Sequence, residues 1–326
     1  GQHIFHNLEY SEVLTSNHYL SDVVGLVYLG LLLPELKEAQ TWRDFGLCEL
    51  ESEMFKQVYP DGTDFEASTH YQRLVNELFL SATLLAQING ITFSPEYLAR
   101  LERMLAVTGL LMRPDGTTPV IGDQDNGRLH RLKVWESPLQ EWADFRPLAA
   151  AGAAWLQKPV GVQFSDSDWV EAFWLAGPQA VRQFQQMQRS STPIIANSTL
   201  LSDSGWVVLQ DSDAYLLIDV GAVGQNEQGG HSHNDSLSID VFANGQVWVV
   251  DPGTFVYTAD YAARHAFRRT QVHNTVYIPG REQSLIDAKV PFQVITPAKT
   301  RVLHWETNAA YSLIAGEVQY GGVPVV

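Results

Sequence analysis

The feature that most constrains this chain is a change in the spacing of its apolar residues near residue 190. Before that point, apolar side chains recur every three or four residues, as they do along one face of a helix. After it, short β-branched and aromatic runs are separated by turn residues, a pattern typical of strands. Because helices and strands are segregated along the chain rather than alternating, we expect a protein of the α+β class.

The first half of the chain predicts six helices, over residues 17–33, 41–58, 68–89, 95–111, 138–154 and 167–187. Ser68, and Ser94 followed by Pro95, are typical of helix starts, since serine caps free N–H groups and proline is tolerated in the first turn. Short turns containing Pro and Gly separate the helices, so successive helices should run antiparallel. Because no strict repeat period is present, we favour an irregular ring or bundle over a repeat array.

The second half predicts strands over residues 205–209, 214–218, 237–242 and 246–250, with further strands at 275–278, 292–295, 301–306 and 311–318. Asn244 and Gly245 stand between two of these runs and form a strong signal for a two-residue hairpin turn. Many short strands joined by turns are typical of antiparallel sheets. We therefore expect a β sandwich or a pair of stacked antiparallel sheets.

Composition limits the classes of partner. A chain of 326 residues with 45% hydrophobic content can bury a large core, and this length favours two domains. The net charge of −16 argues against nucleic acid and against anionic membrane surfaces as partners. No apolar run approaches the roughly 20 residues that cross a bilayer, so we expect no membrane insertion. Cys48 is the single cysteine, which excludes an intrachain disulfide, and we expect it to be a small buried apolar side chain.

The densest cluster of reactive residue types is the segment Gly-Gly-His-Ser-His-Asn-Asp-Ser-Leu-Ser, residues 229–238. His231 and His233 are two positions apart, so in an extended segment they project to the same side. Asp251 ends a predicted strand and His273 precedes another, and with His233 they make a plausible zinc set. The alternative for this triple is a buried histidine bonded to a carboxylate. His231 is left free for proton chemistry.

The helical half has polar residues with simpler explanations. Asn17 begins a predicted helix, where capping is the ordinary role of asparagine. Tyr71, early in another helix, is of a kind that is ordinarily half-buried. The acid- and glycine-rich loop 121–128 raises the possibility of calcium binding, but it lacks the spaced oxygen ligands and distal glutamate of an EF-hand. We expect this loop to be solvated or to lie at the rim of a pocket.

The order of these motifs resembles that of the heparinase II/III-like polysaccharide lyases, from about Asn17 to about Val276. The motifs run Asn-His, Glu-x-Ser-x-x-Tyr, Gly-Asp-x-Asp, Gly-His-x-His-x-Asp-x-Leu-Ser, Val-Asp-Pro-Gly-Thr and Phe-Arg-x-Thr-x-x-His-Asn-Thr. The resemblance implies that residues 1–189 form an incomplete (α/α) toroid of antiparallel helices, part of a longer toroid. Residues 190–326 would form an antiparallel β sandwich that continues past Val326, with substrate in the cleft between the two domains.

The resemblance also implies an activity, the cleavage of a uronate-containing polysaccharide by β-elimination. This reaction needs a group that neutralises the uronate carboxylate, a base for the C5 proton and an acid for the departing O4. By resemblance, Asn17 contacts the carboxyl group, Tyr71 is the acid and often also the base, and His231 completes the proton-transfer set. The resemblance further implies a mainly structural Zn²⁺ and several substrate contacts. The zinc ligands would be His233, Asp251 and His273, and the substrate-binding residues would be His18, Glu66, Arg73 and Asn274.

One position departs from the family pattern. Many relatives carry a histidine directly after the tyrosine, whereas this chain has Gln72 there and His70 before it. One step along a helix rotates a side chain by about 100°, so His70 is not an obvious substitute. Arg73 could bind a carboxylate or sulfate in a bidentate manner, or form a surface salt bridge. Because the chain is acidic overall, we expect an anionic uronate polymer of modest sulfation or none as the partner.

Two other functions remain open from the sequence. One is a diverged, non-catalytic polysaccharide-binding protein on the same scaffold. The other is a zinc hydrolase with an open metal position, for which Asp235 and Glu227 are the nearest candidate bases. The sequence sets no oligomeric state, and we expect a periplasmic or secreted protein although no signal peptide is visible.

Overall fold

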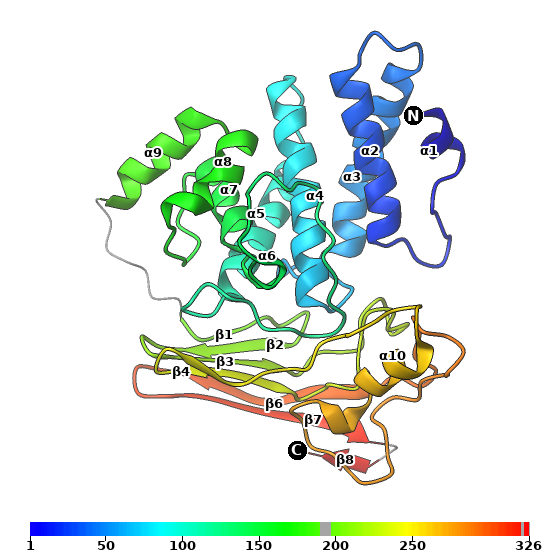
Figure 1. Ribbon diagram of the computed structural model, residues 1–326, viewed down its shortest axis with the longest axis vertical. Helices are drawn as coiled ribbons and strands as arrows, with labels where there is room; N and C mark the ends of the chain where they lie inside the picture. The colour runs from blue at the N-terminus through cyan, green and yellow to red at the C-terminus, as the bar shows by residue number, and fades with distance from the viewer. Residues whose placement is uncertain (190–196, 321–322, 326) are drawn as a thin grey trace.

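The computed structural model describes residues 1–189, 197–320 and 323–325. Figure 1 shows three layers, in which helices of the first half lie over one face of a sheet and a second, smaller sheet lies beneath it. The fold is therefore of the α+β class, with a helical part that fits a toroid followed by stacked antiparallel sheets. Within the described residues, no helix is both long and apolar enough to span a membrane.

Four helices in the first 110 residues begin and end close to the predicted positions, and a short helix over residues 2–6 was not predicted. Ser68 caps α4, its hydroxyl accepting from the backbone N–H groups of His70 and Tyr71, and α4 is buried along most of its length. Ser94 caps α5 in the same way, with Pro95 in the first turn. The bounds are α1 (Gln2–His6), α2 (Asn17–Leu32), α3 (Ala39–Gln57), α4 (Thr69–Ile88) and α5 (Pro95–Leu110).

Two predicted helices are each divided. The segment 138–154 forms α6 (Pro138–Ala143) and α7 (Arg146–Leu156), because the backbone of Asp144 is extended and its carboxylate accepts from Arg146 N–H. The segment 167–187 forms a 3₁₀ turn η1 (Asp166–Asp168), then α8 (Trp169–Leu175) and α9 (Pro178–Arg189). Gly177 has a φ of +86° and Pro178 has no N–H to continue the helix, which explains this break.

The larger sheet is fully antiparallel, with strand order β1-β2-β3-β4-β5. Its strands are β1 (Thr199–Leu200), β2 (Trp206–Gln210), β3 (Ala214–Asp219), β4 (Ile239–Ala243) and β5 (Gln246–Val249). Asn244 and Gly245 have φ of +53° and +77°, so the predicted tight hairpin between β4 and β5 is confirmed. The smaller sheet contains β6 (Lys299–Thr307), β7 (Ser312–Tyr320) and β8 (Val323–Val325).

Three local predictions for the chain are wrong. Residues 275–278 and 292–295 are not strands: Val294, for example, is buried in a small apolar cluster and its N–H donates to the carbonyl of Gln228. Apolar side chains alone do not place a segment in a sheet: Val276 and Ile295 are exposed here, as single apolar side chains on a surface often are. The same region holds an unpredicted helix, α10 (Tyr261–Phe267), capped by Asp260. Cys48 is exposed rather than buried, because it lies on the outer face of α3.

The helical part and the larger sheet share one apolar cluster. Val107, Leu111 and Ile121 pack there with side chains of the sheet, including Trp206 and Tyr215. The Tyr215 hydroxyl donates to the backbone carbonyl of Leu111 at 3.0 Å. The last described helix of the first half ends at Arg189 and β1 begins at Thr199, while residues 190–196 lie outside the described residues. This shared core holds the end of α5 and the loop that contains Ile121 against the sheet.

Candidate active and metal site

The site is built where the start of α4 meets the loop that contains the two histidines. Ser68, the cap of α4, donates through its hydroxyl to the carbonyl of Asp123 at 2.7 Å. The N–H of Asp123 in turn donates to the carbonyl of His231 at 2.8 Å. Gly122 makes this approach possible, because it has a φ of +65° and a Cβ there would lie 2.6 Å from the carbonyl oxygen of His231. Loop 121–123 thus joins Tyr71 on α4 to His231 in the β domain.

Tyr71 and His231 lie face to face. Their ring centroids are 3.7 Å apart and the ring planes are inclined by 20°. The Tyr71 hydroxyl donates to Asp125 Oδ2 at 3.0 Å and lies 3.2 Å from the hydroxyl of Tyr257. Burial, followed by the proximity of Tyr257 and Asp125, raises the pKa of Tyr71 above its ordinary value. The phenol therefore holds its proton and is suited to act as a general acid.

His231 is held by two carboxylates. Its Nδ1 lies 3.0 Å from Asp123 Oδ2, and its Nε2 lies 3.8 Å from Glu66 Oε2. Burial alone would lower the pKa of His231, but the bond to Asp123 and the nearby Glu66 outweigh it and the pKa is raised. Ser232 faces elsewhere, its hydroxyl accepting from Gly224 N–H.

Asn17 reaches the same group of residues through Glu66. The Asn17 Nδ2 lies 3.0 and 2.8 Å from the two carboxylate oxygens of Glu66, and the Asn17 backbone N–H also donates to Glu66. Asn17 is the first residue of α2, and its side chain does not cap the helix. Gln225 donates to Glu66 as well, at 3.3 Å. Asn17, Glu66 and His231 form one connected group, in which a uronate carboxylate would have to share the Asn17 amide nitrogen with Glu66.

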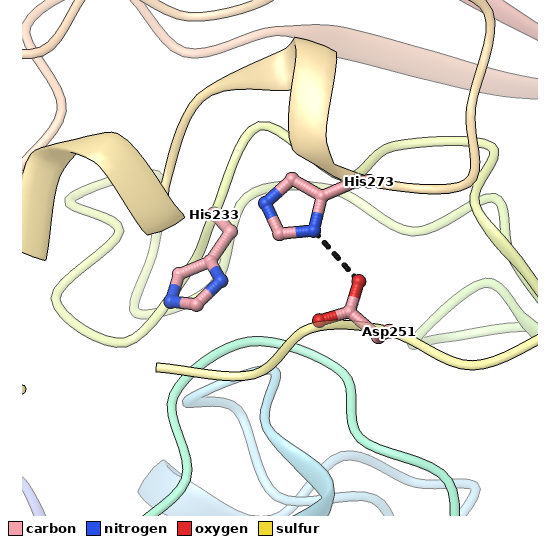
Figure 2. A group of neighbouring side chains, drawn as sticks. All are labelled: His233, Asp251 and His273. Carbon is pink, nitrogen blue, oxygen red and sulfur yellow. Dashed lines mark hydrogen bonds and ion pairs between the residues drawn. The ribbon is translucent and has the colours of Figure 1, made fainter. Parts of the chain in front are cut away.

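His233, Asp251 and His273 gather at one point, as the sequence predicts (Figure 2). One ligand atom from each residue lies within 4.8 Å of the others. His273 Nδ1 is 2.6 Å from Asp251 Oδ2, while His233 Nδ1 and His273 Nε2 are buried without a hydrogen-bond partner among the described residues. Two unpartnered imidazole nitrogens beside a carboxylate are a donor set that suits zinc. These three residues therefore fit a metal ion, although His273 follows a 3₁₀ turn, η2 (Thr270–Val272), rather than preceding a strand.

Asp123 lies between the catalytic candidates and the metal candidates, fully buried. Its carboxylate binds His231 Nδ1 at 3.0 Å, His233 Nε2 at 2.9 Å and both terminal nitrogens of Arg264 at 2.7 and 2.8 Å. Burial would raise the pKa of Asp123, but these bonds lower it well below the ordinary value. The expectation of a solvated loop or pocket rim is therefore wrong for Asp123, since charged and polar side chains surround its carboxylate in place of water.

Sequence reasoning missed several residues of the site. Asp125 and Asp123 stood in a recognised Gly-Asp-x-Asp motif, so a signal for them was present. Tyr257 and Arg264 come from the loop before α10 and from α10 itself, and no local pattern marks them. The Arg264 guanidinium lies 4.8 Å from the Tyr257 ring and 4.6 Å from the Phe292 ring. Arg264 thus contacts both rings and also binds Asp123.

The four predicted substrate-binding residues lie in different surroundings. His18 is exposed and binds Glu9 at 2.7 Å, with no recorded contact to the catalytic candidates within the described ranges. Glu66 is buried and engaged by Asn17. Arg73 is buried, not on the surface, and donates to the carbonyls of residues 141 and 142, and Asn274 donates to the Val250 carbonyl. A role in substrate binding stays a prediction for all four, and the surface salt bridge for Arg73 is wrong.

The two residues flanking Tyr71 are structural. Gln72 is buried and binds the backbone of Asp64 and Gly62, so it tightens the loop before α4. His70 is also buried, and burial, with the charge of Arg73, lowers its pKa to about 3. Its Nε2 lies 3.2 Å from the carbonyl of residue 142. Neither side chain contacts His231, which agrees with the helical geometry.

Comparison with known families defines the class of protein. A model of the heparinase II/III N-terminus matches residues 1–151, and a model of the heparinase II/III-like C-terminal region matches residues 195–319. The two matches occur in the family's order and follow the helical and strand regions of the fold. The chain belongs to the heparinase II/III-like family.

Particular relatives share the sequence and the fold. Heparin-sulfate lyase of Pedobacter heparinus is 26% identical over 300 residues, covering 90% of this chain and 38% of the relative. Heparin-sulfate lyase of Bacteroides stercoris is 26% identical over 265 residues, covering 80% of this chain and 35% of the relative. A crystal structure of a heparan sulfate lyase mutant from Pedobacter heparinus matches with a TM-score of 0.66 at 22% identity, covering 97% of this chain and 43% of that chain. A crystal structure of heparinase III matches with a TM-score of 0.67 at 19% identity, covering 94% of this chain and 43% of that chain. The chain spans well under half the length of these relatives.

Proposed function

We propose that this protein is a polysaccharide lyase that cleaves a uronate-containing polymer by β-elimination and leaves a 4,5-unsaturated uronate end. The observation that carries the proposal is the contact of Tyr71 with His231, which brings an acid from the helical part against a titratable group from the β domain. Asn17 joins them through Glu66. Membership of the heparinase II/III-like family supports the same chemistry.

Each side chain has a role that its surroundings favour. The protonated Tyr71 hydroxyl would donate to the departing O4, because its raised pKa keeps the proton in place until charge develops on that oxygen. His231 Nε2 is the ring atom not bound to Asp123, so in the neutral ring it would face the sugar and take up the C5 proton as the C4–O4 bond breaks and the C4=C5 double bond forms. Asn17 would contact the uronate carboxyl group, which acidifies the C5 proton.

The substrate would be an anionic uronate polysaccharide of modest sulfation or none. The net charge of −16 opposes a polymer with dense sulfate groups, unless a local cation compensates. The related enzymes are named heparin-sulfate lyases, which supports a glycosaminoglycan substrate. Since such polymers are met outside the cytoplasm, we place the protein in the periplasm or outside the cell.

The metal site would serve the architecture rather than the reaction. A Zn²⁺ held by His233, Asp251 and His273 would tie the end of β5 to the segment after α10, next to the reactive residues. The candidate bases of a zinc hydrolase are occupied otherwise: Glu227 is exposed and paired with Lys299, and Asp235 accepts from Gly122 N–H. No observation within the described residues favours hydrolysis.

The test is incubation with a panel of uronate polymers, among them heparan sulfate, heparin, hyaluronate and alginate, while the ultraviolet absorbance of an unsaturated uronate is followed. A lyase raises this absorbance in step with new chain ends. A hydrolase produces chain ends without it, and a binding protein retards the polymer without producing ends. Either of these two results would contradict the proposal.

A further inference from the structure

We propose that Asp123 is the positioning residue of this site, and that its one carboxylate selects the tautomer of both His231 and His233. The inference builds on the proposed function, since one histidine belongs to the proposed reaction and the other to the metal set. Asp123 has no exposed surface, and its oxygens lie 3.0 Å from His231 Nδ1 and 2.9 Å from His233 Nε2. Asp123 is therefore placed to act on two neighbouring rings at once.

The tautomers follow from what a carboxylate can do. An ionised carboxylate accepts hydrogen bonds and donates none, so each ring nitrogen that faces it carries a hydrogen. In the neutral ring, His231 is then protonated at Nδ1, and Nε2 keeps the lone pair that can take up a proton. His233 is protonated at Nε2, and Nδ1 keeps the lone pair.

The His233 Nδ1 lone pair is the one that the metal set requires. This atom is buried and has no hydrogen-bond partner among the described residues. A buried polar atom without a partner is costly, and a metal ion would satisfy it. Carboxylates that bind the second nitrogen of a metal-binding histidine ordinarily fix its tautomer and ring orientation. Here that carboxylate also holds the proton-transfer histidine.

Arg264 keeps Asp123 ionised and oriented. Its two terminal nitrogens bind the two carboxylate oxygens at 2.7 and 2.8 Å, and its Nε donates to the carbonyl of Pro291 at 3.0 Å. Asp123 comes from the helical part, whereas Arg264, His231 and His233 come from the β domain. The hydrogen bonds of this carboxylate therefore form only when the two parts are docked. Metal binding and proton transfer both depend on that docking for this reason.

The experiment uses the full chain with nitrogen-15-labelled histidine, without substrate, at a pH where both rings are neutral. Long-range proton–nitrogen spectra report which nitrogen carries the hydrogen, and His231→Gln and His233→Gln assign the two signals. We expect the Nδ1–H form for His231 and the Nε2–H form for His233. In Asp123→Asn, whose amide can accept at one atom only, at least one of the two signals should change, and Zn²⁺ affinity measured by chelator competition should fall at least about tenfold.

The matched control is Asp240→Asn. Asp240 also forms a buried, bidentate pair across the two parts, with Arg113 at 2.8 and 2.6 Å, but binds no histidine. The Asp240→Asn variant should be less stable than the wild type. Its His231 and His233 tautomers should be unchanged, and its Zn²⁺ affinity should stay within about twofold of the wild-type value. Equal effects of the two substitutions, or none from Asp123→Asn, would overturn the inference.

Two further measurements keep the inference separate from folding and from the proposed function. If Asp123→Asn does not fold, the wild-type spectrum decides, because the opposite tautomer at either histidine contradicts the role of Asp123. On the best uronate polymer, Asp123→Asn should lower kcat at least about tenfold with little change in KM. If no polymer is cleaved, the proposed function fails, and the tautomers and Zn²⁺ affinity still decide the role of Asp123.

Discussion

The rings of Tyr71 and His231 stack at a centroid distance of 3.7 Å, although 160 positions separate them in the chain (231 − 71). Tyr71 belongs to α4 of the helical part, and His231 belongs to the loop before β4 in the β domain. The contact depends on the docking of the two parts. A change that loosens this docking should therefore reduce activity even where it leaves both residues in place.

Replacement of Tyr71 by Phe removes only the hydroxyl and keeps the stacked ring. We expect kcat to fall by at least about 100-fold with KM little changed, because a general acid contributes this much or more. The control is Tyr28→Phe, which also loses a hydroxyl bound to a partner, Ser81, in the helical part. Near-normal turnover in Tyr71→Phe, measured by unsaturated-uronate absorbance, would contradict the proposed role.

Replacement of His233 by Ala should abolish stabilisation by zinc. For the wild type, excess Zn²⁺ at about 100 times its Kd should raise the free energy of unfolding by roughly 2.7 kcal/mol, and a chelator should remove this gain. His231→Ala should lose turnover but keep the gain, since His231 is not in the metal set. His18→Ala, at an exposed histidine, should keep both. A zinc-dependent rise in Tm that persists in His233→Ala would show that the ligand assignment is wrong.

The Arg113–Asp240 pair should contribute strongly to docking of the helical part on the sheet. Both side chains are only 5% exposed, and removal of one member of such a pair leaves an uncompensated buried charge. Arg113→Met should therefore lower the free energy of unfolding by about 3 kcal/mol or more in urea denaturation. Glu317→Gln breaks an exposed pair with Arg301 and should cost less than about 1 kcal/mol. Equal costs would mean that the Arg113–Asp240 pair adds little to docking.

Asp219, at the end of β3, should make stability depend on pH. Burial, and then the nearby Asp235, raises the pKa of Asp219 from 3.8 to about 8. The folded protein thus binds a proton that the unfolded chain releases near pH 4. The contribution of Asp219 to the free energy of unfolding should therefore be highest below about pH 4 and decline as pH rises towards 8.

Asp219→Asn tests this dependence, because an amide stays neutral and can still accept from Gly221 N–H as Asp219 does. At pH 9 the variant should be more stable than the wild type by more than about 1 kcal/mol, the value of one pKa unit. At pH 4, close to the ordinary pKa of an aspartate, the two should differ much less. A difference in Tm that does not change between these pH values would show that Asp219 is ionised in the folded protein.

Local patterns determined much of the fold. The spacing of apolar residues predicted α2 to α5 within a few residues, and serine caps marked the starts of α4 and α5, because both signals act between residues that are close in the chain. The Asn244–Gly245 turn was predictable for the same reason. Apolar composition was a poorer guide at 275–278 and 292–295, because single apolar side chains, such as Val276 and Ile295, also lie exposed on loops.

Some residues of the site were likewise predictable from the sequence, and others were not. Residue types and motif order indicated the candidate metal set of His233, Asp251 and His273, and the structure gathers these side chains. Asp123, by contrast, stood in a loop that looked solvated, yet it binds His231, His233 and Arg264 across sequence separations of 108, 110 and 141 residues.

The chain thus carries its helices, its hairpin and its reactive residue types in local sequence, where short-range sterics and hydrogen bonding decide the outcome. The central place of Asp123, the burial of Arg73 and the exposure of Cys48 were decided by the way the helical part packs on the sheet. That packing depends on the summed burial of side chains distant in sequence. No single segment contains this information, because a carboxylate becomes buried or solvated only once its distant partners are in place.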